Sequence, residues 1–157
     1  MRTYNQIKEV QAYKKDKNCC TVVASTIALD EDFEKMQMTY DSEGRRRNKG
    51  LPHYETRRIL YKVAEARGYA VREVKGQEME EFGGVGVTVN RVERFLRPDK
   101  SYVLCMSGHV AGAIDGKVQD WTEGRRNRVT EIWELTPPKS KQTVELTQWQ
   151  KMMMGLK

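Results

Sequence analysis

The chain has 157 residues, of which 38% are hydrophobic and 32% are charged. This length predicts one domain with a single core, and the mean hydropathy of -0.76 predicts a polar globular protein. No apolar run approaches the roughly 20 residues of a membrane span, and residues 1–18 lack the apolar core of a signal peptide. We therefore expect a cytoplasmic protein that does not act in a membrane.

The cysteines indicate the compartment of the protein, and the net charge indicates the kind of partner it binds. Three cysteines, two of them adjacent, do not form a disulfide framework and fit a reducing compartment. The net charge of +6 favours an acidic partner. The basic residues are scattered, however, and only Arg45, Arg46 and Arg47 form a cluster. Because no known DNA- or RNA-binding motif accompanies this cluster, nucleic acid is the less favoured partner.

The first half of the chain predicts helices. Tyr4, Ile7, Val10 and Tyr13 recur every three residues, which predicts a short amphipathic segment packed on the body. A helical spacing of small and apolar residues then begins at Cys20 and predicts a buried helix that ends near residues 29–30. The partial positive charge at a helix start stabilises a thiolate, and the free amides of the first turn can hold an oxyanion. A lone cysteine is more often a small core residue.

Residues 31–100 predict two further helices, a strand and a short helix. The helices cover residues 31–40 and 55–67, the strand covers residues 69–74, and the short helix follows Thr88 and stops at Pro98. Two irregular segments interrupt them. These are the basic GRRRNKG sequence within residues 41–53 and the glycine-rich residues 76–87. We expect both segments to border the functional site.

Residues 101–121 predict an antiparallel meander that brings a histidine beside an acid. A strand over residues 102–106 is followed by a second strand from His109, a hairpin turn at Asp115 and Gly116, and a third strand that ends at Asp120. His109 and Asp120 then lie on neighbouring strands. A histidine that a carboxylate orients is the base of a nucleophilic dyad or triad, although a structural histidine is the plainer interpretation.

The end of the chain predicts one more strand and a tail. The strand covers residues 128–135, and two prolines follow it. We therefore expect one domain over residues 1–136. Residues 137–157 would form a tail, either a docked short helix or a mobile segment.

Four segments of the chain resemble one family. NCCTVVASTIALD is similar to the cysteine helix of papain-like proteins of bacteriophages and bacteria, which are related to bacteriocin-processing cysteine peptidases. The resemblance continues through GRRRNKG and TVNRVERFLRPDKSYVL to GHVAGAIDGKVQD, and it covers most of residues 16–135. It implies a papain-like α+β fold, in which N-terminal helices carrying the cysteine helix pack on a C-terminal antiparallel β-sheet.

The resemblance also implies a role for each candidate site residue. Cys20 would be the nucleophile, His109 the general base and acid, and Asp120 the orienting carboxylate. Asn18 would stand near the oxyanion. No cofactor is implied.

Two positions depart from the family pattern. Cys19 stands where the family has an acidic residue, and Val23 stands where it has an arginine. DKNC also resembles the D-G-x-C motif of the ovarian-tumour-type deubiquitinases. Cys19 is therefore the alternative nucleophile, although the helical register favours Cys20.

The expected function is a cysteine-dependent acyl-transfer hydrolase. It would be a peptidase or isopeptidase of phage type with a Cys-His-Asp triad, acting in the host cytoplasm on a protein or peptide of the phage or the host. Another acyl transfer, such as an amidase or transglutaminase-like reaction, would use the same site. The alternative function is that of a non-catalytic papain-like protein that binds a host protein or nucleic acid through its basic face.

Two further residues have plainer interpretations, and a metal site is not expected. Cys105 is predicted to be core packing near the site, and His53, in a polar loop, is not expected to act. A zinc site of Cys19, Cys20, Cys105 and a histidine lacks the usual ligand spacing, so we expect no metal.

Overall fold

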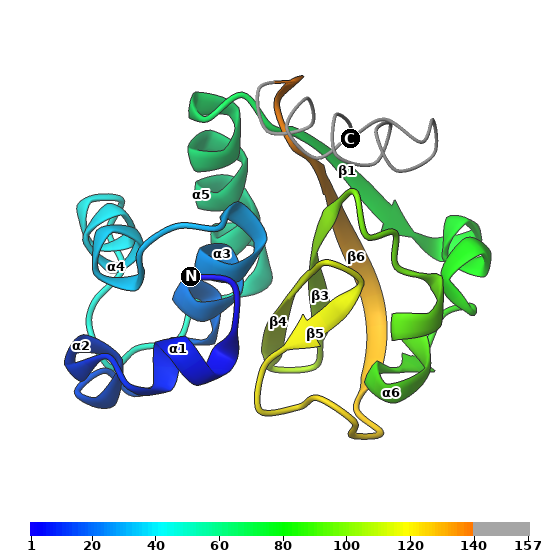
Figure 1. Cartoon of the computed structure of the whole chain (residues 1–157), viewed down its shortest axis with the longest axis horizontal. Coiled ribbons are helices and arrows are strands. Elements are labelled where there is room, and N and C mark those ends of the chain that lie inside the picture. Colours follow the sequence, from blue (N-terminus) through cyan, green and yellow to red (C-terminus); the bar gives the residue numbers. More distant parts are fainter. Residues whose placement is uncertain (140–157) are drawn as a thin grey trace, which may run out of the picture.

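A computed structural model of the chain describes residues 1–139. The described part is an α+β fold, in which the helices of the N-terminal half pack on one face of an antiparallel sheet (Figure 1). This arrangement confirms the fold class expected from the sequence at the level of helices on an antiparallel sheet. Within residues 1–139, no helix has the length and apolar character needed to cross a membrane. The predicted tail falls mostly on residues 140–157, which lie outside the described residues.

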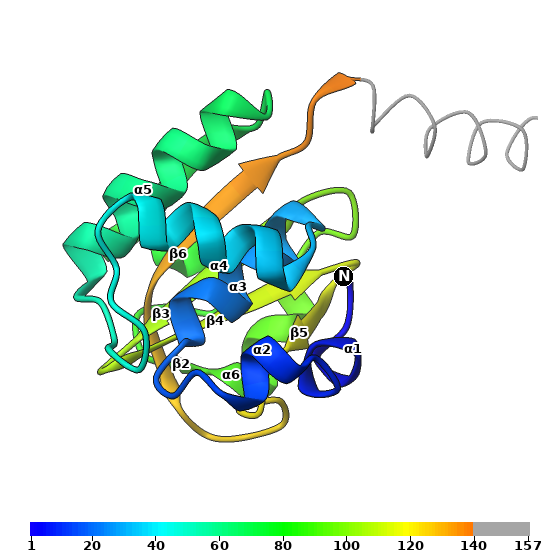
Figure 2. The ribbon, with the colours of Figure 1, turned by 90° about the vertical axis from the view of Figure 1, so that its left-hand side faces the viewer.

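Five helices precede the sheet. They are α1 (Tyr4–Lys8), α2 (Gln11–Lys14), α3 (Cys20–Leu29), α4 (Phe33–Ser42) and α5 (His53–Ala66). Every residue of α3 after Cys20 is buried, because the helix lies between α4 and the sheet (Figures 1 and 2). It ends at Asp30, whose φ of 50° turns the chain out of the helix. The start and the end predicted for this helix are confirmed.

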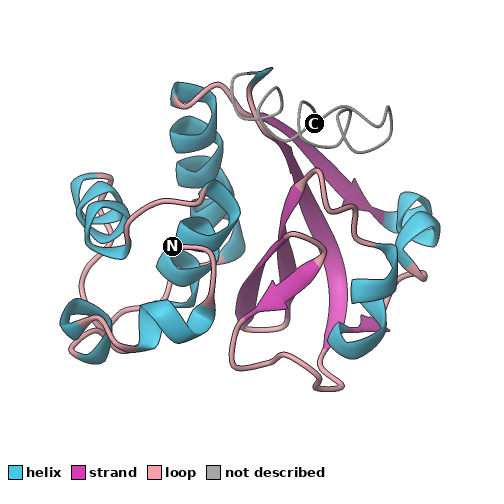
Figure 3. Ribbon diagram, viewed as in Figure 1, coloured by secondary structure: helices cyan, strands magenta, loops and turns pink. Residues whose placement is uncertain are grey.

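The sheet has β3 at its centre. Its strands are β1 (Ala70–Lys75), β2 (Val87–Thr88), β3 (Ser101–Met106), β4 (His109–Ile114), β5 (Lys117–Gln119) and β6 (Arg128–Thr136) (Figure 3). Their order is β1-β6-β3-β4-β5, with β2 on β6, and neighbouring strands are antiparallel. Asp115 and Gly116 form the β4–β5 turn with φ values of 56° and 78°, as a two-residue hairpin requires.

The two faces of the sheet carry separate cores. Val103 and Cys105 of β3 pack with α3 in the first core, whereas Tyr102 and Leu104 point into the second core. Three short helical segments cover this second face. They are η1 (Gly76–Phe82), α6 (Val89–Val92) and η2 (Glu93–Phe95). Because both faces of β3 are covered, all of its residues are buried, and its sequence is an almost continuous apolar run.

The expectation that residues 76–87 border the functional site is wrong. Met79 and Phe82 of η1 are buried in the second core, on the face of the sheet away from α3. Their spacing of three residues lets one side of a short helix bury both side chains. The glycines made this segment look like an open loop, but two apolar anchors hold it against the sheet.

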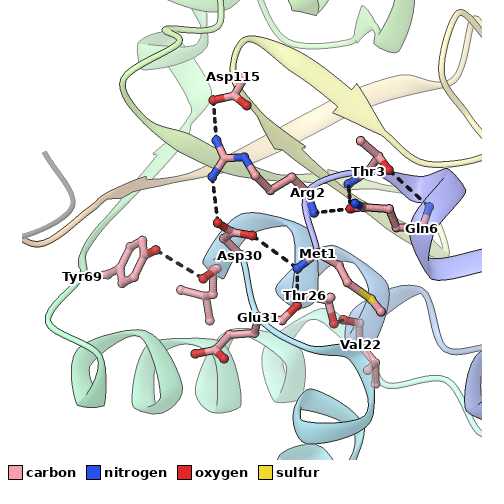
Figure 4. A network of polar contacts seen from close by, with 11 residues as sticks. Met1, Arg2, Thr3, Gln6, Val22, Thr26, Asp30, Glu31, Tyr69 and Asp115 are labelled. Carbon is pink, nitrogen blue, oxygen red and sulfur yellow. Dashed lines mark hydrogen bonds and ion pairs between the residues drawn. The ribbon is translucent and has the colours of Figure 1, made fainter. Parts of the chain in front are cut away.

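Arg2 joins the two layers at the end of α3 that is far from Cys20 along the helix. Its guanidinium donates to Asp30, which ends α3, at 2.8 Å and to Asp115, in the β4–β5 turn, at 2.6 Å (Figure 4). The bridge therefore ties the helix that carries Cys20 to the hairpin that begins with His109.

Candidate active site

Cys20 is the first residue of α3 and the only residue of that helix that is not fully buried. The first hydrogen bond of the helix runs from the amide of Val23 to the carbonyl oxygen of Cys19 at 3.0 Å. The amides of residues 20–22 therefore have no acceptor within the helix. A partly exposed thiol thus lies beside main-chain donors that can stabilise a developing negative charge.

The structure brings His109 and Asp120 together. His109 begins β4, Asp120 directly follows β5, and the His109 Nε2 atom lies 2.7 Å from the Asp120 Oδ2 atom. Asp120 is only 3% exposed. The Thr122 amide and hydroxyl both donate to the same Oδ2 atom, at 3.1 and 2.7 Å. The carboxylate is therefore held in one orientation toward the imidazole, which fixes the ring.

Trp121 covers the imidazole from one side. Its ring centroid lies 4.4 Å from that of His109, at an interplanar angle of 46°, and 39% of its surface is exposed. The indole thereby limits access of water to the hydrogen bond between His109 and Asp120. The sequence interpretation did not assign a role to Thr122. Its position two residues after the acid was the available signal, because an aspartate often accepts a hydrogen bond from the main chain two residues on.

The Cys20 thiol and the His109 imidazole line the same cavity, and each residue shifts the pKa of the other. Since Asp120 engages Nε2, Nδ1 is the ring nitrogen left for the thiol. Burial alone would raise the pKa of Cys20, but the hydrogen bonds from His109 and the Val110 amide outweigh it and lower that pKa below its ordinary value. Burial alone would lower the pKa of His109, but the hydrogen bonds with Asp120 and Cys20 raise it to about 9. The opposed shifts of the two pKa values favour a thiolate on Cys20 paired with an imidazolium on His109.

The other two cysteines lack this activation. Cys19 is 4% exposed and belongs to the first core. Burial and the nearby Asp16 raise the pKa of Cys19 to about 12, so its thiol stays protonated. Burial likewise raises the pKa of Cys105, which lies in the same core. Of the two candidate nucleophiles, the geometry therefore supports Cys20.

Asn18 has a different environment from the one expected of an oxyanion donor. Its side-chain amide donates to the carbonyl oxygen of Asn48 at 3.2 Å, and its φ is 58°. It is not among the residues that line the cavity at Cys20. The main-chain amides of α3 are therefore the better-placed oxyanion donors, and a role for Asn18 stays a prediction.

The expectation that Arg45 contributes to an exposed basic cluster is wrong. Arg45 is 3% exposed and donates to both carboxylate oxygens of Asp16, at 2.7 and 2.9 Å. The Asn48 amide and the Gln37 side chain also donate to Asp16. Burial alone would raise the pKa of Asp16, but these hydrogen bonds, with that of Arg45 the strongest, lower it. The pair anchors the segment just before Cys20, whereas Arg46 and Arg47 are exposed.

A cavity of about 330 Å³ opens beside the thiol and the imidazole. Its lining residues are Cys20, Thr21, Leu51, Pro52, His53, Gly108, His109 and Val110. His53, which was expected to have no role, thus stands in the wall of the cavity. The basic segment leads directly into this wall, so the expectation that it borders the site is supported on this side. A group bound in this cavity would lie beside the Cys20 thiol.

Neither a metal site nor a known relative assigns a further role to these residues. Among residues 1–139, no three His, Cys, Asp or Glu side chains are grouped so that they could hold a metal ion. The comparisons found no match to the chain among protein-family models, curated proteins or solved structures.

Proposed function

We propose that the protein is a cysteine-dependent acyl-transfer hydrolase with a papain-like triad, acting as a peptidase or isopeptidase. One observation carries the proposal. Buried Asp120 holds His109, and His109 in turn contacts the partly exposed Cys20 at a helix start and beside a cavity. The order of these residues along the chain and the resemblance of their segments to the papain-like family support the same proposal.

The reaction begins at the Cys20 thiolate. Its sulfur attacks the carbonyl carbon, the C–S bond forms, and the electron pair of the carbonyl moves to its oxygen. The amides of residues 20–22 stabilise this oxyanion. When the tetrahedral intermediate collapses, the C–N bond breaks and the His109 imidazolium gives its proton to the leaving nitrogen. The product at this stage is a thioester on Cys20 and a free amine.

Water completes the cycle. Neutral His109 takes a proton from the water as its oxygen attacks the thioester carbon. The C–S bond then breaks, which releases a carboxylic acid and restores the thiolate beside an imidazolium. Asp120 keeps its hydrogen bond to the ring throughout and stabilises the charged imidazolium. The reaction uses only groups of this chain and water.

A non-catalytic scaffold is less well supported by this site. A binding surface has no need for a thiol of lowered pKa beside a histidine of raised pKa, and such opposed shifts are typical of catalytic groups. The exposed basic residues Arg46 and Arg47 fit either function, because they can also attract an acidic substrate.

Peptide cleavage tests the proposal directly. We would incubate the protein and its Cys20→Ala variant with a peptide library made from a bacterial proteome and identify new termini by mass spectrometry. We expect new termini with the wild type and none with the variant. If the two samples do not differ, the protein is not a peptidase of these sequences. Formation of hydroxamates from added hydroxylamine and simple esters would then show whether Cys20 performs another acyl transfer.

A further inference from the structure

We infer that His53 determines substrate specificity at this site, by binding a carboxylate group of the acyl substrate through its Nε2 atom. This inference rests on the proposed function, because it assigns a substrate class to the cavity beside Cys20. His53 belongs to α5, whereas the catalytic groups belong to α3, β4 and the segment after β5. His53 therefore lies in a different wall of the cavity from the proposed triad.

The Nε2 atom of His53 is buried and has no hydrogen-bond partner among residues 1–139. A buried polar atom without a partner costs free energy, and such atoms in native proteins call for an explanation. His53 lines the same cavity as Cys20 and His109. Because this atom is closed to solvent, the ring must rotate to present it to a substrate group in the cavity, and the hydrogen bond formed there would remove the cost.

The surroundings of His53 favour an anionic oxygen as its partner. Leu51 and Pro52 form the adjacent wall and supply no hydrogen-bond donor from their side chains. Arg46 and Lys49 precede this wall in the chain, and both are exposed. Within residues 1–139, neither side chain forms an ion pair. The first amides of α5, at residues 53–54, also lack acceptors within the helix. The positive charge of the segment before this wall and the free amides at the start of α5 favour a carboxylate as the ligand.

Two alkylating reagents of equal length test the inference. N-iodoacetylglycine carries a carboxylate where N-ethyliodoacetamide carries a methyl group. With each reagent the Cys20 thiolate forms a C–S bond and iodide leaves, and the alkylated peptide is measured by mass spectrometry. Rates are divided by those of free cysteine, which removes the intrinsic difference between the reagents. The ratio of the two normalised rates then reports recognition of the carboxylate.

We expect Cys20 of the wild type to prefer the carboxylate reagent. His53→Leu, which keeps the size of the side chain and removes its hydrogen bond, should lower this preference about tenfold, the loss of one charge-assisted hydrogen bond. The rate with the neutral reagent should stay within about twofold, which shows that the fold and the thiolate are intact. Tyr54→Phe, on the exposed neighbour of His53, is the matched control and should change neither rate.

The two ways of failing are distinct. If Cys20 reacts quickly with the neutral reagent but His53→Leu keeps the preference for the carboxylate, the role of His53 is wrong and the proposed function stands. If Cys20 reacts with both reagents no faster than free cysteine, the proposed function fails and the inference fails with it.

Discussion

Gly112 lies directly against the main chain of Ala24, where β4 crosses α3. A Cβ atom at Gly112 would lie 2.7 Å from the Ala24 carbonyl oxygen and 2.9 Å from the Ile27 Cβ atom. The backbone of α3 cannot yield to this atom without moving as a whole. Because α3 carries Cys20 and β4 carries His109, this close contact helps to set the separation of the proposed nucleophile and its proposed base.

Gly112→Ala should therefore destabilise the fold and separate the proposed catalytic pair, Cys20 and His109. We expect a loss of about 2–3 kcal/mol in the free energy of unfolding in urea, as for an overpacked core, together with slower alkylation of Cys20. Gly50→Ala is the matched control, because its Cβ would lie 3.9 Å from the nearest atoms. The control should stay within about 0.5 kcal/mol of the wild type. Equal stability of the two variants would show that the contact at Ala24 does not fix the layers.

We expect Thr122 to be a positioning residue that acts through Asp120. Thr122→Val keeps the shape of the side chain but removes the hydroxyl that donates to the carboxylate at 2.7 Å. We expect kcat for a cleaved peptide to fall about tenfold, which corresponds to about 1.4 kcal/mol in the barrier, with KM unchanged. Thr122→Ser restores the hydroxyl and should recover most of the rate. A parallel loss in both variants would indicate a packing role instead.

Local patterns in the sequence were sufficient to predict α3 and the β4–β5 hairpin. The helical spacing from Cys20 and the Asp115–Gly116 turn each depend on neighbours in the chain, so they hold without knowledge of the fold. The same two features determine where Cys20, His109 and Asp120 lie, which is why the sequence could place them in one hypothesis.

Features that depend on distant partners were not predictable in this way. Arg45 is buried because Asp16, 29 residues earlier, meets it across the fold. His53 lines the cavity because the loop before α5 folds back toward Cys20. Residues 76–87 lie on the far face of the sheet, because Met79 and Phe82 require a core. Composition made all three segments look like solvent-exposed loops.

The Asp16–Arg45 pair makes the stability depend on acid pH. The folded protein lowers the pKa of Asp16, so this contribution is present above the unfolded pKa of about 3.9 and is lost as the pH falls toward the folded value. Asp16→Asn leaves Arg45 buried without its charge partner, and we expect a loss of about 3–5 kcal/mol at pH 7. Unfolding in urea at several pH values from 3 to 7 should show a weaker acid dependence in the variant.

Asp115→Asn provides the comparison for that experiment. Asp115 also pairs with an arginine, Arg2, but its side chain is 55% exposed. Solvent screens such a pair, so the cost should stay below about 1 kcal/mol. If Asp16→Asn costs no more than Asp115→Asn, the buried pair does not anchor the segment before Cys20.

The most direct test of the proposed site is the alkylation rate of Cys20 as a function of pH. Limiting iodoacetamide would be applied from pH 4 to 10 to the wild type and to His109→Ala, with the modified cysteine identified by mass spectrometry. In the wild type we expect rapid reaction at Cys20 well below the ~8.5 pKa of a free thiol, and a second change near pH 9, where His109 loses its proton. His109→Ala should leave one titration at a higher pH, because burial then raises the pKa of Cys20 without the histidine to oppose it. A wild-type Cys20 that titrates as a free thiol, with a profile that His109→Ala leaves unchanged, would contradict the proposed catalytic pair.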